Sequence, residues 1–126
     1  EGLKTSLVDA LRLYDKFAFM ARARDLDLYV YESGTHFDYE TEDPKIEQLF
    51  VDATHDERMA KLYTRNLEAF KEAGGTIINA WGWIGANDPW ANSDNLKDVK
   101  HPKYRALRSF AEGQPCWWQY CDRSQR

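Results

Sequence analysis

Apolar side chains recur every three to four residues in several stretches of the chain, which is the spacing of one helix face. This pattern predicts three helices, over residues 6–24, 54–73 and 102–113. Thr54 and Glu57 have the spacing of a capping box at the start of the second helix. Gly74 and Gly75 stand where that helix should stop. A shorter helix is expected around residues 46–50.

Two short segments have the composition of strands. Residues 26–31 and 76–81 are rich in aromatic and β-branched side chains. In the first of them the apolar groups fall on both faces after Asp27, as in a strand that is covered on both sides. Helices and strands therefore alternate along the chain, and this order predicts parallel strands joined by crossover connections.

The connections differ in length in a way that suggests a β/α barrel. Each predicted strand is entered by a few residues and left by a segment of about 20, the asymmetry that places an active site at the carboxyl ends of barrel strands. A complete barrel needs eight strands and about 250 residues. We therefore expect residues 1–113 to be the C-terminal segment of a TIM-type (β/α)8 barrel, with the remaining strands supplied by the same gene product or another chain. Residues 114–126 would form an aromatic tail. The pattern leaves a small α/β layer as the alternative.

Composition narrows the class of protein. The 126 residues are 43% hydrophobic and 30% charged, which is typical of a packed globular domain. A net charge of −4 makes nucleic acid an unexpected partner. No apolar run approaches the length of a membrane span, so none is expected. The compartment is not fixed by the sequence, and an extracellular location or a place in a larger assembly is favoured.

Glu32 is the candidate catalytic residue. It ends the first predicted strand, next to Tyr31, at the point where the chain enters a loop. A carboxylate held at the rim of a pocket suits glycoside hydrolysis, in which it attacks the anomeric carbon or stabilises the charge that develops there. His36 lies four residues further on and could orient Glu32 or contact a sugar. The alternative is that Glu32 begins a solvated loop.

Aromatic and amide side chains follow the second predicted strand. Trp81, Trp83 and Trp90 could stack on a sugar ring, and Asn79 could hydrogen-bond its hydroxyl groups. Tryptophans at strand ends are also ordinary core residues, and this interpretation stays open. Together with Tyr31 and His36, these residues are the candidate set for binding a carbohydrate substrate.

No cofactor or metal ion is expected. Histidines without acidic ligands at metal spacing do not indicate a metal site. Cys116 and Cys121 are separated by four residues, and they could form a disulfide or remain free thiols.

Several segments together are similar to a known family. Residues 26–36, which include the run from Tyr31 to His36, resemble the seventh strand of β/α-barrel glycoside hydrolases of the retaining clan A type and related hydrolase-like proteins. The resemblance continues through residues 55–63, 73–81 and 102–107, and it covers about residues 3–112.

The resemblance implies a polysaccharide-hydrolysing activity. The nucleophile of the family falls on Glu32, and the aromatic residue that floors the sugar subsite falls on Trp81 or Trp83. The general acid/base of the family lies on a fourth strand that this chain lacks. Ser33 replaces a glycine of the family pattern. A non-catalytic carbohydrate-binding or structural component of a larger assembly is the alternative function.

Overall fold

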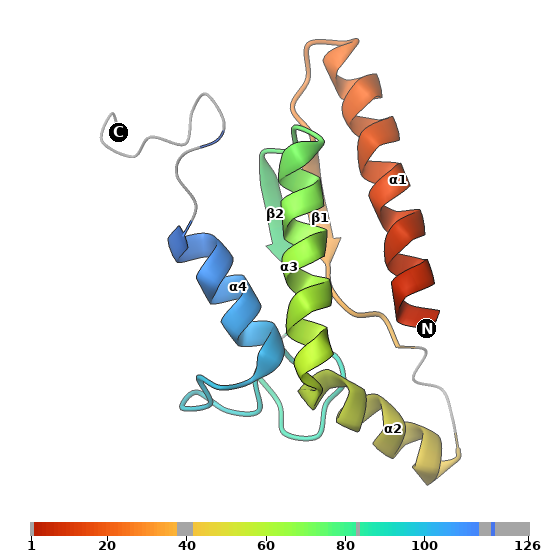
Figure 1. The fold of residues 1–126 in the computed structure, drawn as a ribbon, viewed down its shortest axis with the longest axis vertical. Helices are drawn as coiled ribbons and strands as arrows, with labels where there is room; N and C mark the ends of the chain where they lie inside the picture. The colour runs from red at the N-terminus through yellow and green to blue at the C-terminus, as the bar shows by residue number, and fades with distance from the viewer. Residues whose placement is uncertain (1, 38–41, 83, 114–116, 118–126) are drawn as a thin grey trace.

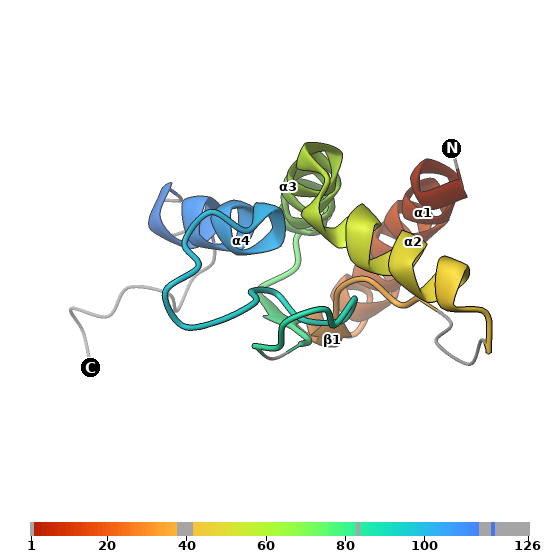
Figure 2. The same cartoon turned by 90° about the horizontal axis from the view of Figure 1, so that it is seen from below.

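The computed structural model describes residues 2–37, 42–82, 84–113 and 117 of the chain. Its elements, in chain order, are α1 (Gly2–Arg22), β1 (Tyr29–Ser33), α2 (Pro44–His55), α3 (Glu57–Glu72), β2 (Ile77–Ala80) and α4 (Pro102–Gly113). Figure 1 shows α1, α3 and α4 side by side, with α2 crossing one end of this group. In Figure 2 these helices form one layer, and the two strands lie on a single side of it. The described residues thus form two layers, one of helices and one of strands.

The sheet consists of β1 and β2, which pair in parallel. Tyr29 lies opposite Ile77 and Val30 lies opposite Ile78. The register then shifts, so that Ser33 lies opposite Ala80. The parallel pairing predicted from the alternation of helices and strands is confirmed, although the first strand begins at Tyr29 rather than at Leu26. The backbone N–H of Leu26 instead donates to the carbonyl of Ala21, at the end of α1.

The predicted (β/α)8-barrel segment is wrong. The described residues form four helices and one two-stranded sheet, and the strands span only five and four residues. The outer face of the sheet is also open: Tyr29 and Tyr31 are 60% and 83% exposed. The aromatic side chains of β1 therefore reflect the general preference of strands for such residues rather than cover on both faces. A small α/β layer, the alternative that the pattern left open, describes this arrangement.

The junction between α2 and α3 differs from the predicted capping box. Asp56 is the N-cap of α3, and its carboxylate accepts a hydrogen bond from the backbone N–H of Arg58 at 2.8 Å. Thr54 belongs to α2, where its hydroxyl is buried and donates to the carbonyl of Val51. Asp56 is extended and separates the two helices, which explains why one longer helix does not form.

The end of α3 agrees with the prediction. The backbone N–H of Gly75 donates to the carbonyl of Phe70, and that of Gly74 donates to the carbonyl of Lys71. This pair of bonds is a Schellman motif, which ends helices with a residue of positive φ such as Gly74. A β-carbon on Gly75 would overlap the Phe70 ring, so glycine is also required there for close packing.

The core lies among α2, α3 and α4. Met59 and Tyr63 of α3 pack there with Phe37 and with Ala106 of α4. The rings of Phe37 and Phe50 stack with centroids 4.9 Å apart. A second contact joins α3 to α1, where the fully buried Phe70 packs edge-on against Tyr14. These contacts hold the helices together, and one face of the sheet is turned toward them.

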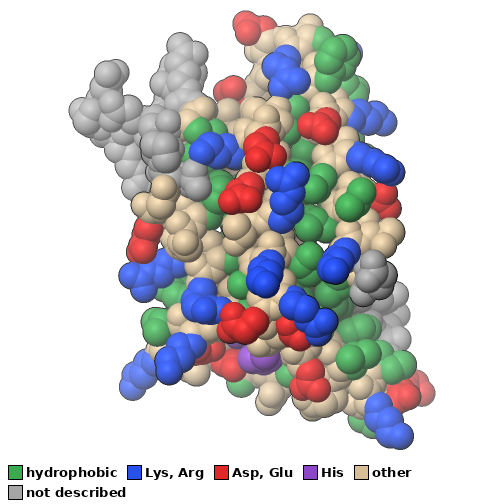
Figure 3. Space-filling view, in the orientation of Figure 1, with side chains coloured by type: hydrophobic (Ala, Val, Ile, Leu, Met, Phe, Trp, Pro, Cys, Tyr) green, Lys and Arg blue, Asp and Glu red, His purple; other side chains and the backbone are tan. Residues whose placement is uncertain are grey.

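The surface of the helix layer carries both signs of charge. Figure 3 shows basic and acidic side chains interspersed over this face. Within the described part of the chain, no helix combines the length and the apolar character that crossing a membrane requires. Of the predicted tail, only Trp117 is described. Its indole N–H donates to the carbonyl of Gly75 at 2.9 Å, whereas Cys116 and Cys121 lie outside the described residues.

Candidate functional site

A cavity of about 140 Å³ opens at the carboxyl ends of the two strands. It is lined by residues 32–36 from the end of β1 and by Trp81 and Trp90 from the segment that follows β2, and it is called the strand-end cavity below. The cavity brings together four of the residues singled out from the sequence: Glu32, His36, Trp81 and Trp90. Parallel strands end at the same edge of a sheet, which is why residues distant in sequence meet here.

A larger cavity shares residues 32–36 with the strand-end cavity. Its volume is about 510 Å³, and it lies between the sheet and the helices α1 and α3, so it is called the interlayer cavity. Val30 and Ile78 form part of its sheet side, and Tyr14 and Leu67 form part of its helix side. The segment of residues 32–36, which includes the end of β1, therefore lines two cavities, one at the strand ends and one under the helix layer.

Glu32 contributes an accessible carboxylate to both cavities. Its side chain is exposed, and it has no ion-pair or hydrogen-bond partner among the described residues. The register shift between Val30 and Ser33 occurs around this residue. An irregularity of this kind changes the direction of a side chain relative to the regular alternation of a strand. The carboxylate is consequently available to a ligand rather than committed to the fold.

His36 and Trp90 form one side of the strand-end cavity. Their ring centroids lie 4.5 Å apart with an interplanar angle of 76°, so the rings meet edge to face. The backbone of Trp90 is fixed by a bond from its N–H to the carboxylate of Asp88 at 2.8 Å. This arrangement holds an aromatic surface in the same cavity that Glu32 lines.

Polar side chains from two helices fix the end of β1. The hydroxyl of Tyr14 donates to the side-chain oxygen of Asn66 at 3.0 Å, and the amide of Asn66 donates to the hydroxyl of Ser33 at 3.0 Å. The carbonyl of Ser33 accepts a bond from the backbone N–H of Trp81 at 2.6 Å. Helices α1 and α3 and the end of β2 thus all hold Ser33, the residue that follows Glu32.

A second chain of hydrogen bonds joins the loop after β1 to the segment after β2. The hydroxyl of Tyr63 accepts a bond from the backbone N–H of Thr35 at 3.2 Å and donates to Asn92 at 3.4 Å. The side-chain amide of Asn92 donates to the carbonyl of Trp81 at 3.0 Å. Burial raises the pKa of Tyr63 above its ordinary value.

Lys103 joins both loops to the start of α4. It is fully buried, and its ammonium donates to the hydroxyl of Thr35 at 2.8 Å and to the carbonyls of Pro89 and Ala91 at 2.7 and 3.0 Å. These bonds use all three donors of the group. Burial lowers the pKa of Lys103 to about 8. The residue positions the loops and does not itself line the strand-end cavity.

The other residues proposed from the sequence do not join this site. Tyr31 lies on the exposed outer side of the sheet, and neither Tyr31 nor Asn79 lines the strand-end cavity or the interlayer cavity. Trp83 lies outside the described residues. Conversely, sequence reasoning missed Lys103 and Asn92. The polar Asn66, within an otherwise apolar helix stripe, is a signal that could have identified part of the network.

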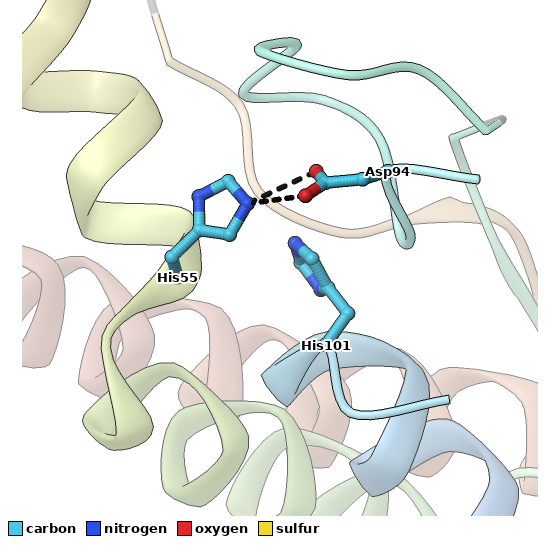
Figure 4. Close-up of side chains that lie close together, drawn as sticks. All are labelled: His55, Asp94 and His101. Atoms are coloured by element: carbon cyan, nitrogen blue, oxygen red, sulfur yellow. Dashed lines mark hydrogen bonds and ion pairs between the residues drawn. The ribbon is translucent and has the colours of Figure 1, made fainter. Parts of the chain in front are cut away.

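A separate polar cluster lies at the junction of α2, the segment after β2, and α4. Nε2 of His55 lies 2.9 and 3.0 Å from the two carboxylate oxygens of Asp94. The ring centroid of His101 lies 4.9 Å from that of His55. Figure 4 shows the rings of both histidines beside the carboxylate of Asp94. One ligand atom from each of these three side chains lies within 4.8 Å of the others. No local spacing in the sequence indicates this cluster, because its members come from three separate segments.

Burial and charge act in opposite directions on the two histidines of this cluster. Burial lowers the pKa of His55, but its bonds to the Val51 carbonyl and to Asp94 outweigh this effect and raise the pKa overall. For His101, burial is the largest effect and lowers the pKa, and the charge of His55 lowers it further. Asp98 contributes a second negative charge near both rings.

Comparisons of the chain with protein-family models, with curated proteins and with solved structures found no match.

Proposed function

We propose that the strand-end cavity binds a carbohydrate. The observation that carries this proposal is the meeting of one accessible carboxylate, Glu32, with the imidazole of His36 and the indoles of Trp81 and Trp90. Indole surfaces pack on the apolar face of a sugar ring, and carboxylate and imidazole groups hydrogen-bond its hydroxyls.

The size of the cavity limits the part of a carbohydrate that it would hold. Pockets for drug-sized ligands measure about 300–1,000 Å³, whereas this one is about 140 Å³. We therefore propose that it takes one sugar unit, with the rest of an oligosaccharide extending into solvent. The edge-to-face contact of His36 and Trp90 would form one wall of this subsite.

Glycoside hydrolysis with Glu32 as nucleophile is the second candidate function. The accessible and unpartnered carboxylate favours it, but a retaining mechanism needs a second carboxyl group about 5–5.5 Å away. Among the described residues that line the two cavities, Glu32 is the only acid. Hydrolysis would thus require an acid from outside these linings, and binding is the function that the geometry supports best.

Binding can be tested by calorimetry with soluble oligosaccharides of glucose, xylose, mannose and N-acetylglucosamine. We expect Trp81→Ala and Trp90→Ala to weaken binding at least about tenfold, which corresponds to about 1.4 kcal/mol. Tyr31→Ala is the matched control, because it removes an exposed aromatic residue of the same sheet that lies outside the cavity. Equal affinities for the parent protein and all three variants would refute the proposed site.

Hydrolysis can be tested by measuring the release of reducing ends from the same oligosaccharides. If Glu32 is a nucleophile, Glu32→Gln abolishes release and retains binding. Glu68→Gln, which changes an exposed carboxylate on α3, should leave both unchanged. Binding by the parent protein without any release of reducing ends would leave only the carbohydrate-binding function.

A further inference from the structure

The cluster of His55, Asp94 and His101 lies at a junction of three segments. His55 is the last residue of α2, Asp94 lies in the segment between β2 and α4, and His101 directly precedes Pro102, the first residue of α4. Figure 4 shows the three side chains converging from these separate parts of the chain. The cluster is separate from the carbohydrate site, because none of the three residues lines the strand-end cavity or the interlayer cavity.

The hydrogen bonds of His55 leave one ring nitrogen directed at the carboxylate. Its Nδ1 lies 2.8 Å from the carbonyl of Val51, which only accepts, so Nδ1 must carry a proton. In the neutral ring, Nε2 then has a lone pair, and this lone pair faces both oxygens of Asp94. The lone pair of Nε2 and the carboxylate oxygens of Asp94 are all acceptors, yet they lie only 2.9 and 3.0 Å apart. This arrangement requires a cation between them, either a second proton on the ring or a metal ion.

His101 favours the metal ion. Its ring is nearly inaccessible, since the residue is only 3% exposed, and Figure 4 shows the nitrogen farther from the backbone turned toward the Asp94 carboxylate. This nitrogen has no hydrogen-bond partner among the described residues, whereas Nδ1 of the same ring accepts a long 3.3 Å bond from the N–H of Lys103. A proton shared by His55 and Asp94 accounts for two of the three converging groups, and a metal ion accounts for all three.

From this geometry we propose that His55, Asp94 and His101 bind a divalent transition-metal ion such as Zn²⁺. Two imidazoles and one carboxylate are a ligand set that these ions prefer, and a backbone carbonyl that accepts from the other nitrogen of a ligating histidine is the usual second partner. Ligands of a tetrahedral zinc ion lie about 3.4 Å apart, given bonds of about 2.1 Å. The present limit of 4.8 Å requires only a small closure.

Binding at the outer nitrogen of His101 moves the ring proton to Nδ1. This change breaks the 3.3 Å bond from the Lys103 N–H, which is a first-turn donor of α4 and has no partner within its own helix. The side chains of His55 and Asp94 are 37% and 32% exposed, so water can reach the fourth coordination position. Such a site would tie the end of α2 and the start of α4 to the segment between β2 and α4.

Calorimetric titration of the chelator-treated protein with ZnCl2 at neutral pH tests this proposal. We expect one zinc ion per chain, and at least about tenfold weaker binding in Asp94→Asn and His55→Ala, since even the loss of an outer partner costs about 10–100-fold. His36→Ala is the matched control, because it removes a histidine outside the cluster and should bind zinc like the parent. Zinc should also raise the melting temperature of the parent and not that of Asp94→Asn.

Two results would overturn the proposal. The first is the absence of stoichiometric zinc binding, with ¹⁵N spectra that show His55 protonated on both nitrogens whether or not zinc is added; the cation would then be a proton. The second is zinc binding that survives in Asp94→Asn and His55→Ala but disappears when Cys116 and Cys121 are both replaced by serine. Circular dichroism of each variant confirms that a loss of binding does not reflect unfolding.

Discussion

Gly82 lies where the segment after β2 folds back closely on itself. A β-carbon at this position would overlap the carbonyl oxygen of Trp90 and lie 2.9 Å from the side-chain nitrogen of Asn92. Its φ of +123° is also a conformation that side-chain-bearing residues rarely adopt. Both wall tryptophans of the carbohydrate site, Trp81 and Trp90, therefore depend on a residue without a side chain between them.

Gly82→Ala should lower the free energy of unfolding by about 1–3 kcal/mol, because the new methyl group creates both overlap and backbone strain. Urea denaturation measures this change. Gly113→Ala, at a position where the added carbon comes within 4 Å of nothing beyond its own turn of helix α4, should cause no loss. Similar midpoints for Gly82→Ala and the parent would contradict the close approach described here.

At the scale of elements, Lys103 connects the start of α4 to the ends of both strands. Its three hydrogen bonds reach the loop after β1, at Thr35, and the segment after β2, at Pro89 and Ala91. The two strands are short, so the geometry of their carboxyl ends depends on this contact with a helix. Helix α4 thus contributes to the site without lining the strand-end cavity.

Lys103→Met keeps most of the apolar stem and removes the three donors. We expect a loss of about 1–3 kcal/mol in stability, because the buried Ala91 carbonyl loses its bond from the ammonium and the Pro89 carbonyl keeps only the bond from the Thr35 hydroxyl. We also expect faster hydrogen exchange of the Thr35 amide. Lys100→Met, a change of an exposed lysine just before α4, should alter neither quantity. Unchanged exchange at Thr35 in Lys103→Met would show that the ammonium does not position the loop.

The local patterns of the chain predicted its helices better than its sheet. The helical periodicity and the stop at Gly74 and Gly75 depend on residues a few positions apart, and these predictions agree with the structure. Local spacing does not single out the cap at Asp56, because Thr54 fits equally well and only its burial in α2 decides between them. The barrel prediction is wrong because the aromatic residues of β1 report strand preference and not which face is covered.

The site shows the same division between local and long-range information. Parallel strands end at one edge, so the proximity of Glu32 and Trp81 followed from the order of elements. Lys103 and Asn92 reach the site through loops that have no periodic pattern. The cluster of His55, Asp94 and His101 likewise depends on how the segment between β2 and α4 folds back, and no spacing in the sequence reports this.

At the scale of the whole molecule, the described residues have a closed interior among the helices and an open outer face of the sheet. Phe70 is fully buried under the helix layer, whereas Tyr31 on β1 is 83% exposed. Burial of apolar surface is the dominant contribution to stability. The packing around Phe70 should therefore contribute far more to the free energy of unfolding than the outer face of the sheet.

Phe70→Ala should cost about 3–5 kcal/mol, because it leaves a cavity in a closed core. Tyr31→Ala should change stability by less than about 0.5 kcal/mol, as is usual for exposed positions. Both values come from urea denaturation of the two variants and the parent. A loss for Tyr31→Ala as large as that for Phe70→Ala would mean that the outer face is covered in solution.

The carbohydrate site is tested most directly by nuclear magnetic resonance of the protein labelled with ¹⁵N in its backbone and tryptophan side chains. During titration with the four oligosaccharides at millimolar concentration, at least one sugar should shift the indole N–H signals of Trp81 and Trp90 and the amides of residues 32–36. The indole of Trp117, which is bonded to Gly75, should stay in place. Spectra that no sugar changes, or shifts confined to residues outside the cavity, would contradict the account.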